Sequence, residues 1–567
     1  MGLDSSLFTS ATTSERRFFN ITTAYFAAGA FDYFGIESVI DEAMKKEGSH
    51  VKITNGECVK ALVCQLLSHP YQSLSGTAEF FSNHPLSALL QDTNVTPDCL
   101  NRAVLSRMLD DLYEAGPEQL FIKVARKVLE KLQVKTNTVH IDSTSMHFHG
   151  KTYSEEGCDV ELTMGYSRDL HPELNQVISV MLCEEQTQLP IFQKAFSGNT
   201  SDHKSFNKVV LESWELLKEQ FADLKYLVGD SALCTSEIAN NIAKQGIKFV
   251  TRVPDNNLIA KECFALAKGA EFAQIEPIEQ NGSQGMWCKN GKIGEQEVKL
   301  LLVNNENLRP AKETTVTKHA NKELAELEKK LKKLETKPCK CQKDAEKQVN
   351  EIQSKLKFCT LNDITYEEVT GYPKRGKPAK DAEKVTLAVK VHAHPAINED
   401  KLKEQIESSI RYVIATNDVN REWTMKELLN IYKKQSVVER GWRFMKCHKL
   451  MVDSLFLRKP SRITALTWIM ILALLIYTAS EFLLRQKMQE NKIKIPALTH
   501  KRGEERPTMM RFLQYLCNCQ VIMEYEHSSK RCLFGNIPPE LQQILTALGR
   551  DWCKYFTPEG YLPFLKA

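Results

Sequence analysis

Three carboxylates occupy positions from which they could share a divalent cation. Asp142 follows the apolar run 139–141, Asp230 follows the apolar run 226–229, and Glu439 lies in a later helical pattern. Carboxylate oxygens are the ligands that Mg²⁺ prefers, and a bound Mg²⁺ leaves room for substrate phosphate. The sequence therefore predicts metal-assisted phosphoryl chemistry, with Asp142, Asp230 and Glu439 as catalytic residues and metal ligands.

The surroundings of Glu439 predict a polyanionic substrate. Tyr432, Gln435, Glu439 and Lys446 fall at helical spacings that place them on one face. Residues 425–462 hold 10 Lys and Arg against 3 Asp and Glu, whereas residues 1–130 hold 11 against 16. A basic surface beside carboxylates fits a polyanion better than a small neutral molecule. Taken singly, Arg440, Arg443 and Lys449 are more typical of a solvated basic face, whereas together they favour a path for the polyanion.

Elements that could position the carboxylates follow one another through residues 133–254. The pattern predicts strands at 139–141, 177–183, 190–196, 226–229 and 247–251, with helices at 202–220 and 235–245. The order β-β-β-α-β-α-β is that of an RNase H-like α/β fold. That fold would place Asp142 on the central first strand and Asp230 at the end of the adjacent fourth strand.

The remaining segments suggest four further parts of the chain. Residues 1–132 are helical in pattern and predict an all-α N-terminal domain. Residues 255–420 interrupt the core as a β-rich insertion, with strands at 292–303 and 385–392 and an antiparallel helical hairpin at 317–358. The core resumes at 421–485, and 486–567 form a C-terminal segment for DNA or dimer contacts.

One apolar stretch, residues 463–484, is long enough to span a bilayer of about 30 Å. It contains several Thr and Ser residues and Glu481, and it closely follows the predicted catalytic helix. A buried core helix is therefore favoured over a membrane span, and no membrane partner is expected. The start of the chain lacks the pattern of a secretory signal, and its sixteen cysteines are scattered. A reducing cytosol is the expected location.

Histidines near Asp142 suggest a second kind of metal site. His140, His147 and His149 are close in sequence, and imidazole suits Zn²⁺ better than Mg²⁺. His140 lies two residues before Asp142 on a predicted strand, so the two side chains share a face. We expect His140 to pack against the carboxylate site rather than to bind metal.

Several ordered motifs resemble the DDE transposases of prokaryotic insertion sequences, in the branch with a Y-(2)-R-(3)-E-(6)-K signature. Tyr432, Glu439 and Lys446 match that signature in spacing and type, whereas Gln435 stands where the signature has arginine. Further matches are Gly165-Tyr-Ser-Arg-Asp169, Pro172-Glu-Leu-Asn-Gln176, Gly198-Asn-Thr-Ser-Asp202, Val228-Gly-Asp-Ser231, Leu457-Arg-Lys-Pro-Ser-Arg462 and Arg506-Pro-Thr-Met-Met-Arg511.

This resemblance implies an enzyme that frees the ends of an element and joins them to target DNA. Asp142, Asp230 and Glu439 would hold two Mg²⁺ or Mn²⁺ ions. The resemblance also implies a homodimer on paired double-stranded DNA ends, meaning the terminal inverted repeats of the element, and DNA contacts near the ions. The candidate DNA-binding residues are Tyr432, Gln435, Arg440, Arg443 and Lys446.

Two other functions are compatible with parts of the sequence. An RNase H-like nuclease would cleave without strand transfer, although it would need neither the large insertion nor the long C-terminal segment. An immobile, transposase-derived DNA-binding protein would lack catalysis, although the three carboxylates are intact.

Overall fold

The computed structural model of the chain describes most of its residues and divides them into two compact units. The first unit holds residues 1–251, 293–296 and 430–567, and the second holds 252–292 and 297–429. The described residues are 16–45, 51–68, 74–148, 154–167, 171–266, 276–279, 282–372, 385–445, 457–497, 503–526 and 531–564.

A mixed sheet forms the centre of the first unit. Its strand order is β4-β3-β2-β5-β6. β2 pairs antiparallel with β3, and β3 pairs antiparallel with β4. β5 is parallel to both of its neighbours, β2 and β6. The strands are β2 (Thr138–Phe148), β3 (Asn175–Glu184), β4 (Pro190–Ser197), β5 (Tyr226–Gly229) and β6 (Lys248–Val253).

Two helices connect these strands, α8 (Asp202–Gln220) and α9 (Ser236–Lys244). The predicted positions of both helices and of four strands are confirmed within two residues. The exception is β2, which continues to Phe148 instead of ending at Asp142. The apolar run 139–141 marks only the part of β2 that also pairs with β5. Beyond this part, β2 pairs with β3 alone and contains more polar residues, so the apolar pattern does not reveal that the strand continues.

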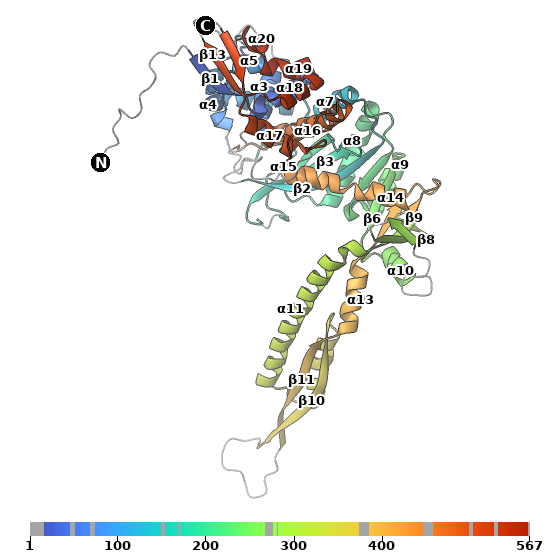
Figure 1. The fold of residues 1–567 in the computed structure, drawn as a ribbon. Helices are drawn as coiled ribbons and strands as arrows, with labels where there is room; N and C mark the ends of the chain where they lie inside the picture. Colours follow the sequence, from blue (N-terminus) through green and yellow to red (C-terminus); the bar gives the residue numbers. More distant parts are fainter. Residues whose placement is uncertain are drawn as a thin grey trace, which may run out of the picture. The chain divides into compact units, whose positions relative to one another are not determined.

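The apolar stretch at 463–484 lies in α16 (Pro460–Glu490), which contacts α3, α6, α7, α18 and β4 (Figure 1). Within the described chain it is the helix long and apolar enough to cross a membrane, and most of its apolar window is buried inside the protein. Polar contacts also fix it: the Trp468 indole donates to the Pro117 carbonyl at 2.8 Å, and the Arg462 guanidinium donates to both oxygens of Asp110. The prediction of a buried helix is confirmed.

The N-terminal helices pack with the C-terminal segment. The region is not all-α, because β1 (Arg16–Asn20) pairs antiparallel with β13, which in turn pairs with β14. The Trp552 indole, near the C-terminus, donates to the Phe26 carbonyl at 3.0 Å. The elements are α1 (Thr23–Phe34), α2 (Ile36–Ala43), α3 (Asn55–Ser68), α4 (Thr77–Ser82), α5 (Leu86–Leu90), α6 (Arg102–Glu114), α7 (Pro117–Leu132), α17 (Met509–Cys519), β13 (Ile522–Glu526), β14 (Arg531–Gly535), α18 (Pro539–Leu548), α19 (Arg550–Cys553) and α20 (Pro558–Tyr561).

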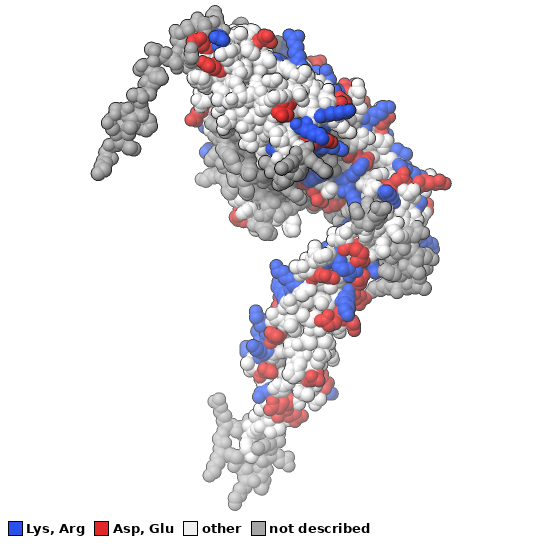
Figure 2. Space-filling view, viewed as in Figure 1, with Lys and Arg blue, Asp and Glu red and all other residues white. Residues whose placement is uncertain are grey.

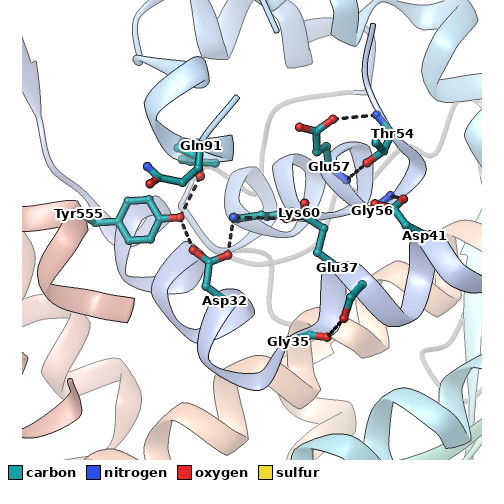
Figure 3. Close-up of polar contacts among 12 residues, drawn as sticks. Asp32, Gly35, Glu37, Asp41, Thr54, Gly56, Glu57, Lys60, Gln91 and Tyr555 are labelled. Atoms are coloured by element: carbon teal, nitrogen blue, oxygen red, sulfur yellow. Dashed lines mark hydrogen bonds and ion pairs between the residues drawn. The ribbon is translucent and has the colours of Figure 1, made fainter. Parts of the chain in front are cut away.

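A buried polar network joins these two ends of the chain (Figure 3). Lys60 on α3 is 1% exposed, and its ammonium lies 2.5 Å from Asp32 Oδ1 on α1. The other oxygen, Asp32 Oδ2, accepts from the Tyr555 hydroxyl at 2.5 Å and lies 2.6 Å from Lys554 Nζ. Although burial opposes ionisation, these two lysines hold the pKa of Asp32 below its usual range. The network ties α1 and α3 to the C-terminal residues.

We expect Lys60→Met to destabilise the first unit by about 3–5 kcal/mol, because it leaves the buried carboxylate of Asp32 short of one cation. Thermal or urea unfolding of the purified chain measures the loss. Lys487→Met is the matched control, since Lys487 pairs with Glu490 on the surface at 2.8 Å and its side chain is 32% exposed. The control should change stability by less than about 1 kcal/mol. Equal losses for the two variants would contradict the prediction.

The second unit contains its own strands, in the order β12-β9-β8-β7. The single strand predicted at 292–303 is wrong. Two strands, β8 and β9, meet there at a turn where Gly294 has a φ of 59°, a backbone conformation that favours glycine. The elements that lie wholly or mostly in this unit are α10 (Leu258–Leu266), β7 (Glu276–Glu279), β8 (Ser283–Ile293), β9 (Gln296–Asn305), α13 (Glu399–Ser409), β12 (Arg411–Thr416) and α14 (Met425–Lys433).

An elongated module of this unit combines α11 (Arg309–Thr336), α12 (Gln342–Gln353), β10 (Cys359–Gly371) and β11 (Val385–Ile397). Both predicted helices of the segment 317–358 are present, but they pack mainly on the antiparallel β10–β11 ribbon rather than on each other. Their leucines and valines share one core with ribbon residues: Leu327, Leu331, Leu334, Val349, Leu361, Val389 and Val391. The ribbon buries the apolar faces that a helical hairpin would otherwise have buried between its helices.

Candidate functional site

The first two carboxylates lie at the same level on neighbouring strands. β2 and β5 are parallel, and the last paired residues are His140 and Val228. Asp142 and Asp230 each lie two residues further along, and both are half-buried. Adjacent strands are about 4.8 Å apart, so this register brings the two carboxylates together at the end of β5.

Local contacts fix the end of β5. Asp230 Oδ1 accepts from the Ala232 amide at 2.9 Å and so caps a short 3₁₀ turn. The Asp230 carbonyl accepts from the Thr251 hydroxyl at 2.6 Å, which ties this point to β6. At Gly229 a Cβ atom would lie 3.0 Å from Ile141 Cγ2, so glycine allows β5 to approach β2 closely just before both carboxylates.

Glu439 lies on a separate short helix, α15 (Ser436–Met445), in its first turn, and its side chain is exposed. The expectation of one continuous helix does not hold between Tyr432 and Glu439, and Lys446 lies outside the described residues. α14 ends at Lys433, and Gln435 lies in the turn between the helices, where its amide donates to the Tyr432 carbonyl at 2.9 Å. This bond reaches back three residues rather than four, so the α-helical pattern is interrupted before Glu439.

Gln435 is the residue that connects α15 to β2. Its side chain is 7% exposed, and its Nε2 donates to the Ile141 carbonyl at 2.7 Å. Its Oε1 lies 3.2 Å from His140 Nδ1. This differs from the expected DNA contact at Gln435, because both ends of the amide are used inside the protein. The bonds attach the residue just before α15 to the strand segment just before Asp142.

His140 is fully buried, as expected of a residue packed against the site. Because Gln435 uses its amide nitrogen on Ile141, its oxygen faces the ring, and His140 Nδ1 must donate the proton. Burial lowers the pKa of His140 to about 4, and the hydrogen bond to Gln435 only partly opposes this effect. His140 is therefore a neutral imidazole at pH 7. The burial of His140 beside the site was expected from its alternation with Asp142, whereas its pairing with Gln435 was not predicted.

Close packing holds α15 against the sheet (Figure 1). A Cβ atom at Gly441 would lie 3.0 Å from Met181 Cε on β3 and 3.2 Å from Leu474 Cδ2 on α16. Met181 is the residue of β3 that pairs with Asp142. The helix that carries Glu439 is thus packed against β3, at the residue that pairs with Asp142, and against α16.

The glycine motifs that support the family resemblance act through the backbone. Gln176 on β3 donates from Nε2 to the Gly198 carbonyl at 2.7 Å, and a Cβ atom at Gly165 would lie 2.1 Å from that same oxygen. No side chain fits there. This tight crossing precedes α8, whose first residue, Asp202, accepts from the Ser143 hydroxyl at 2.6 Å. These motifs therefore support β2 on the side opposite Asp142.

The candidate DNA-binding residues are described to different extents. Tyr432 is half-buried at the end of α14, and Arg440 is exposed on α15 next to Glu439. Arg443 is in α15, but its side chain lies outside the described residues, as do His149 and Lys446.

The side chains present suit a hard cation, but they are not gathered into a closed metal site. In the part of the chain that the structure describes, no group of three His, Cys, Asp or Glu residues lies at metal-binding distances. Asp142 and Asp230 adjoin by strand register, whereas Glu439 is exposed on its own helix. Oxygen donors of this kind fit Mg²⁺ or Mn²⁺ better than Zn²⁺.

Comparisons with known proteins agree with this arrangement. The family model described as a transposase DDE domain matches residues 135–476. A second one, a domain of unknown function (DUF4277), matches residues 20–126. The first match covers more than half of the chain. The chain therefore belongs to the DDE transposase family and is a protein of DNA transposition.

Solved structures give weaker likenesses. The chain is similar to the piggyBac transposase in its synaptic complex with hairpin DNA, at 11% identity over 86% of this chain and 80% of that chain, with a TM-score of 0.36. It is also similar to the Mos1 transposase in a paired-end complex with the left transposon end, at 12% identity over 41% and 71%, with a TM-score of 0.14. A search of curated proteins finds no match.

Proposed function

We propose that this chain cleaves DNA at the ends of an insertion sequence and joins those ends to target DNA by a two-metal DDE mechanism. The observation that carries the proposal is the register of β2 and β5, which sets Asp142 level with Asp230. The strand order β4-β3-β2-β5-β6, with its antiparallel and parallel halves, supports an RNase H-like core. The active form would be a homodimer on paired double-stranded ends, in the bacterial cytosol.

The residues would divide the work as follows. Asp142, Asp230 and Glu439 would hold two Mg²⁺ or Mn²⁺ ions. When bound, such ions activate the attacking water or 3′-hydroxyl and stabilise the leaving oxygen. Gln435 and Gly441 hold α15 against the sheet, and from there Glu439 would complete the ligand set with the two aspartates. Exposed Arg440 would neutralise phosphate charge beside the carboxylates.

Incubating the purified chain with DNA that carries the element's own ends tests this proposal. The ends are recognised in the flanking genomic DNA as inverted repeats bordered by duplicated target bases. We expect Mg²⁺-dependent strand cleavage followed by joined products, both lost in excess EDTA. Cleavage without joining would indicate a nuclease, and metal-independent binding without cleavage would indicate an immobile relative.

We expect Lys446→Ala to weaken DNA binding, because the signature places this cation at the phosphate backbone. Loss of one phosphate contact should lower the slope of log affinity against log salt by about 0.9. Fluorescence anisotropy over a series of KCl concentrations measures the slope. Lys218→Ala on α8, an exposed lysine away from α15, serves as the control. An unchanged slope in Lys446→Ala would remove this residue from the DNA interface.

A further inference from the structure

We infer that α11 of the second unit carries a binding surface for the phosphate backbone of duplex DNA. The surface consists of Lys318, Lys322, Lys329 and Lys333, called here the lysine stripe. The four residues are spaced by four, seven and four positions. At 100° per residue this spacing confines them to about 60° of the helix surface, over a rise of about 22 Å. All four side chains are exposed.

The stripe lies opposite the face that α11 uses for folding. Leu327, Leu331 and Leu334 face the core shared with β10 and β11. Figure 2 shows Lys and Arg side chains gathered along the outer edge of α11. The stripe therefore contributes nothing to the packing of the module and is open to solvent.

Other charges of the module have partners within it. Glu323 accepts from the backbone amides of Phe358 and Cys359 at 2.7 and 2.9 Å, which pins the start of β10 to α11. On the ribbon, His392 lies 3.0 Å from a carboxylate oxygen of Glu367 and 3.3 Å from one of Glu335. These three glutamates, Glu323, Glu335 and Glu367, thus have partners within the module.

The lysines of the stripe, by contrast, form no ion pair with any residue that the structure describes. Even Glu326, which lies near the edge of the stripe, is not within salt-bridge distance of them. Lys318 with Lys322, and Lys329 with Lys333, are like charges at i and i+4, an arrangement that destabilises a helix. A row of unpaired positive charge that works against its own helix is explained if a polyanion neutralises it.

A DNA strand fits this row better than an acidic protein surface does. The stripe is linear, and its residues are flexible point charges that do not define directional pockets. Each strand of duplex DNA carries one phosphate per 3.4 Å of helix axis, so a row of about 22 Å can contact several phosphates without reading sequence. The inference rests on the proposed function in one respect, namely that the chain acts on DNA.

Salt-dependent binding of the full chain to a fluorescein-labelled 40-base-pair duplex of arbitrary sequence tests the stripe. The variant is K318Q/K322Q/K329Q/K333Q. We expect its salt slope to be shallower by about 2–4, because each lost phosphate contact removes about 0.9. Its affinity at 100 mM KCl should fall at least about tenfold. The titrations contain EDTA, which removes divalent metal, so binding is measured without metal-dependent cleavage.

The matched control is K330Q/K343Q/K347Q/K355Q, which removes the same charge from exposed lysines of α11, α12 and the following turn. It should keep a slope within about one of the wild type. Circular dichroism and light scattering report folding and oligomeric state. A wild-type slope in the stripe variant overturns the inference, and so does a change of oligomeric state with the slope unchanged. If the stripe variant has the shallower slope but the wild type never cleaves end DNA, the proposed function fails while the inference about the stripe stands.

Discussion

Asp142→Asn, Asp230→Asn and Glu439→Gln should each lower metal-dependent cleavage of end DNA by at least about 1,000-fold, or about 4 kcal/mol of barrier. Each change removes the negative charge of one proposed metal ligand and keeps its shape. Asparagine can still accept from the Ser143 amide at position 142, as Asp142 does at 2.8 Å. It is also a good cap at position 230, so the fold should survive.

Single-turnover cleavage in Mg²⁺ gives the rates, and calorimetric titration with Mn²⁺ gives a second readout that does not depend on DNA. We expect the variants to bind Mn²⁺ more weakly than the wild type and to bind DNA normally in EDTA. Asp223→Asn, at an exposed aspartate before β5, is the control for the substitution itself. A variant that cleaves within about tenfold of the wild-type rate would show that its residue is not a ligand.

Gln435→Met should slow cleavage by about 100-fold, or about 2.7 kcal/mol of barrier. Methionine keeps the length of the side chain but loses both hydrogen bonds, to the Ile141 carbonyl and to His140 Nδ1. Without them α15 is less well held against β2, and displacement of Glu439 by about 1 Å is enough for such a loss. The two groups left unpaired in the interior should also destabilise the fold by about 2–4 kcal/mol.

The measurements are single-turnover rate, thermal stability and DNA affinity in EDTA, of which only the last should stay unchanged. Gln489→Met, at an exposed glutamine on α16, makes the same substitution without a buried partner and should be neutral. A Gln435→Met variant with wild-type rate and stability would show that the amide does not position α15.

For the Gln435→Arg variant, the sequence signature and the structure lead to opposite expectations. The signature has arginine here and by itself predicts tolerance. The buried position predicts impairment, because a guanidinium placed at a site only 7% exposed loses its hydration. We therefore expect the rate of this variant to fall by more than about tenfold. A rate within threefold of the wild type would favour the signature.

The sequence by itself determined the family and most of the sheet. Strands such as β3 and β5 are short apolar runs bounded by turns, and α8 has a clear helical period, so local pattern was enough. The carboxylates at 142, 230 and 439 could be selected because their order along the chain matched that of the elements. The buried nature of α16 followed from its polar residues and its place after the catalytic helix.

Only the tertiary structure decided how the third carboxylate is placed. The helical spacing from Tyr432 to Lys446 predicted one continuous face. Spacing alone cannot show that one helix ends and another begins within such a run. At this turn the buried Gln435 bonds to β2, almost 300 residues earlier in the chain, a contact that local spacing does not reveal. The same reason explains the module of α11 and α12: an amphipathic helix shows which face it buries, but not whether a helix or a ribbon covers it.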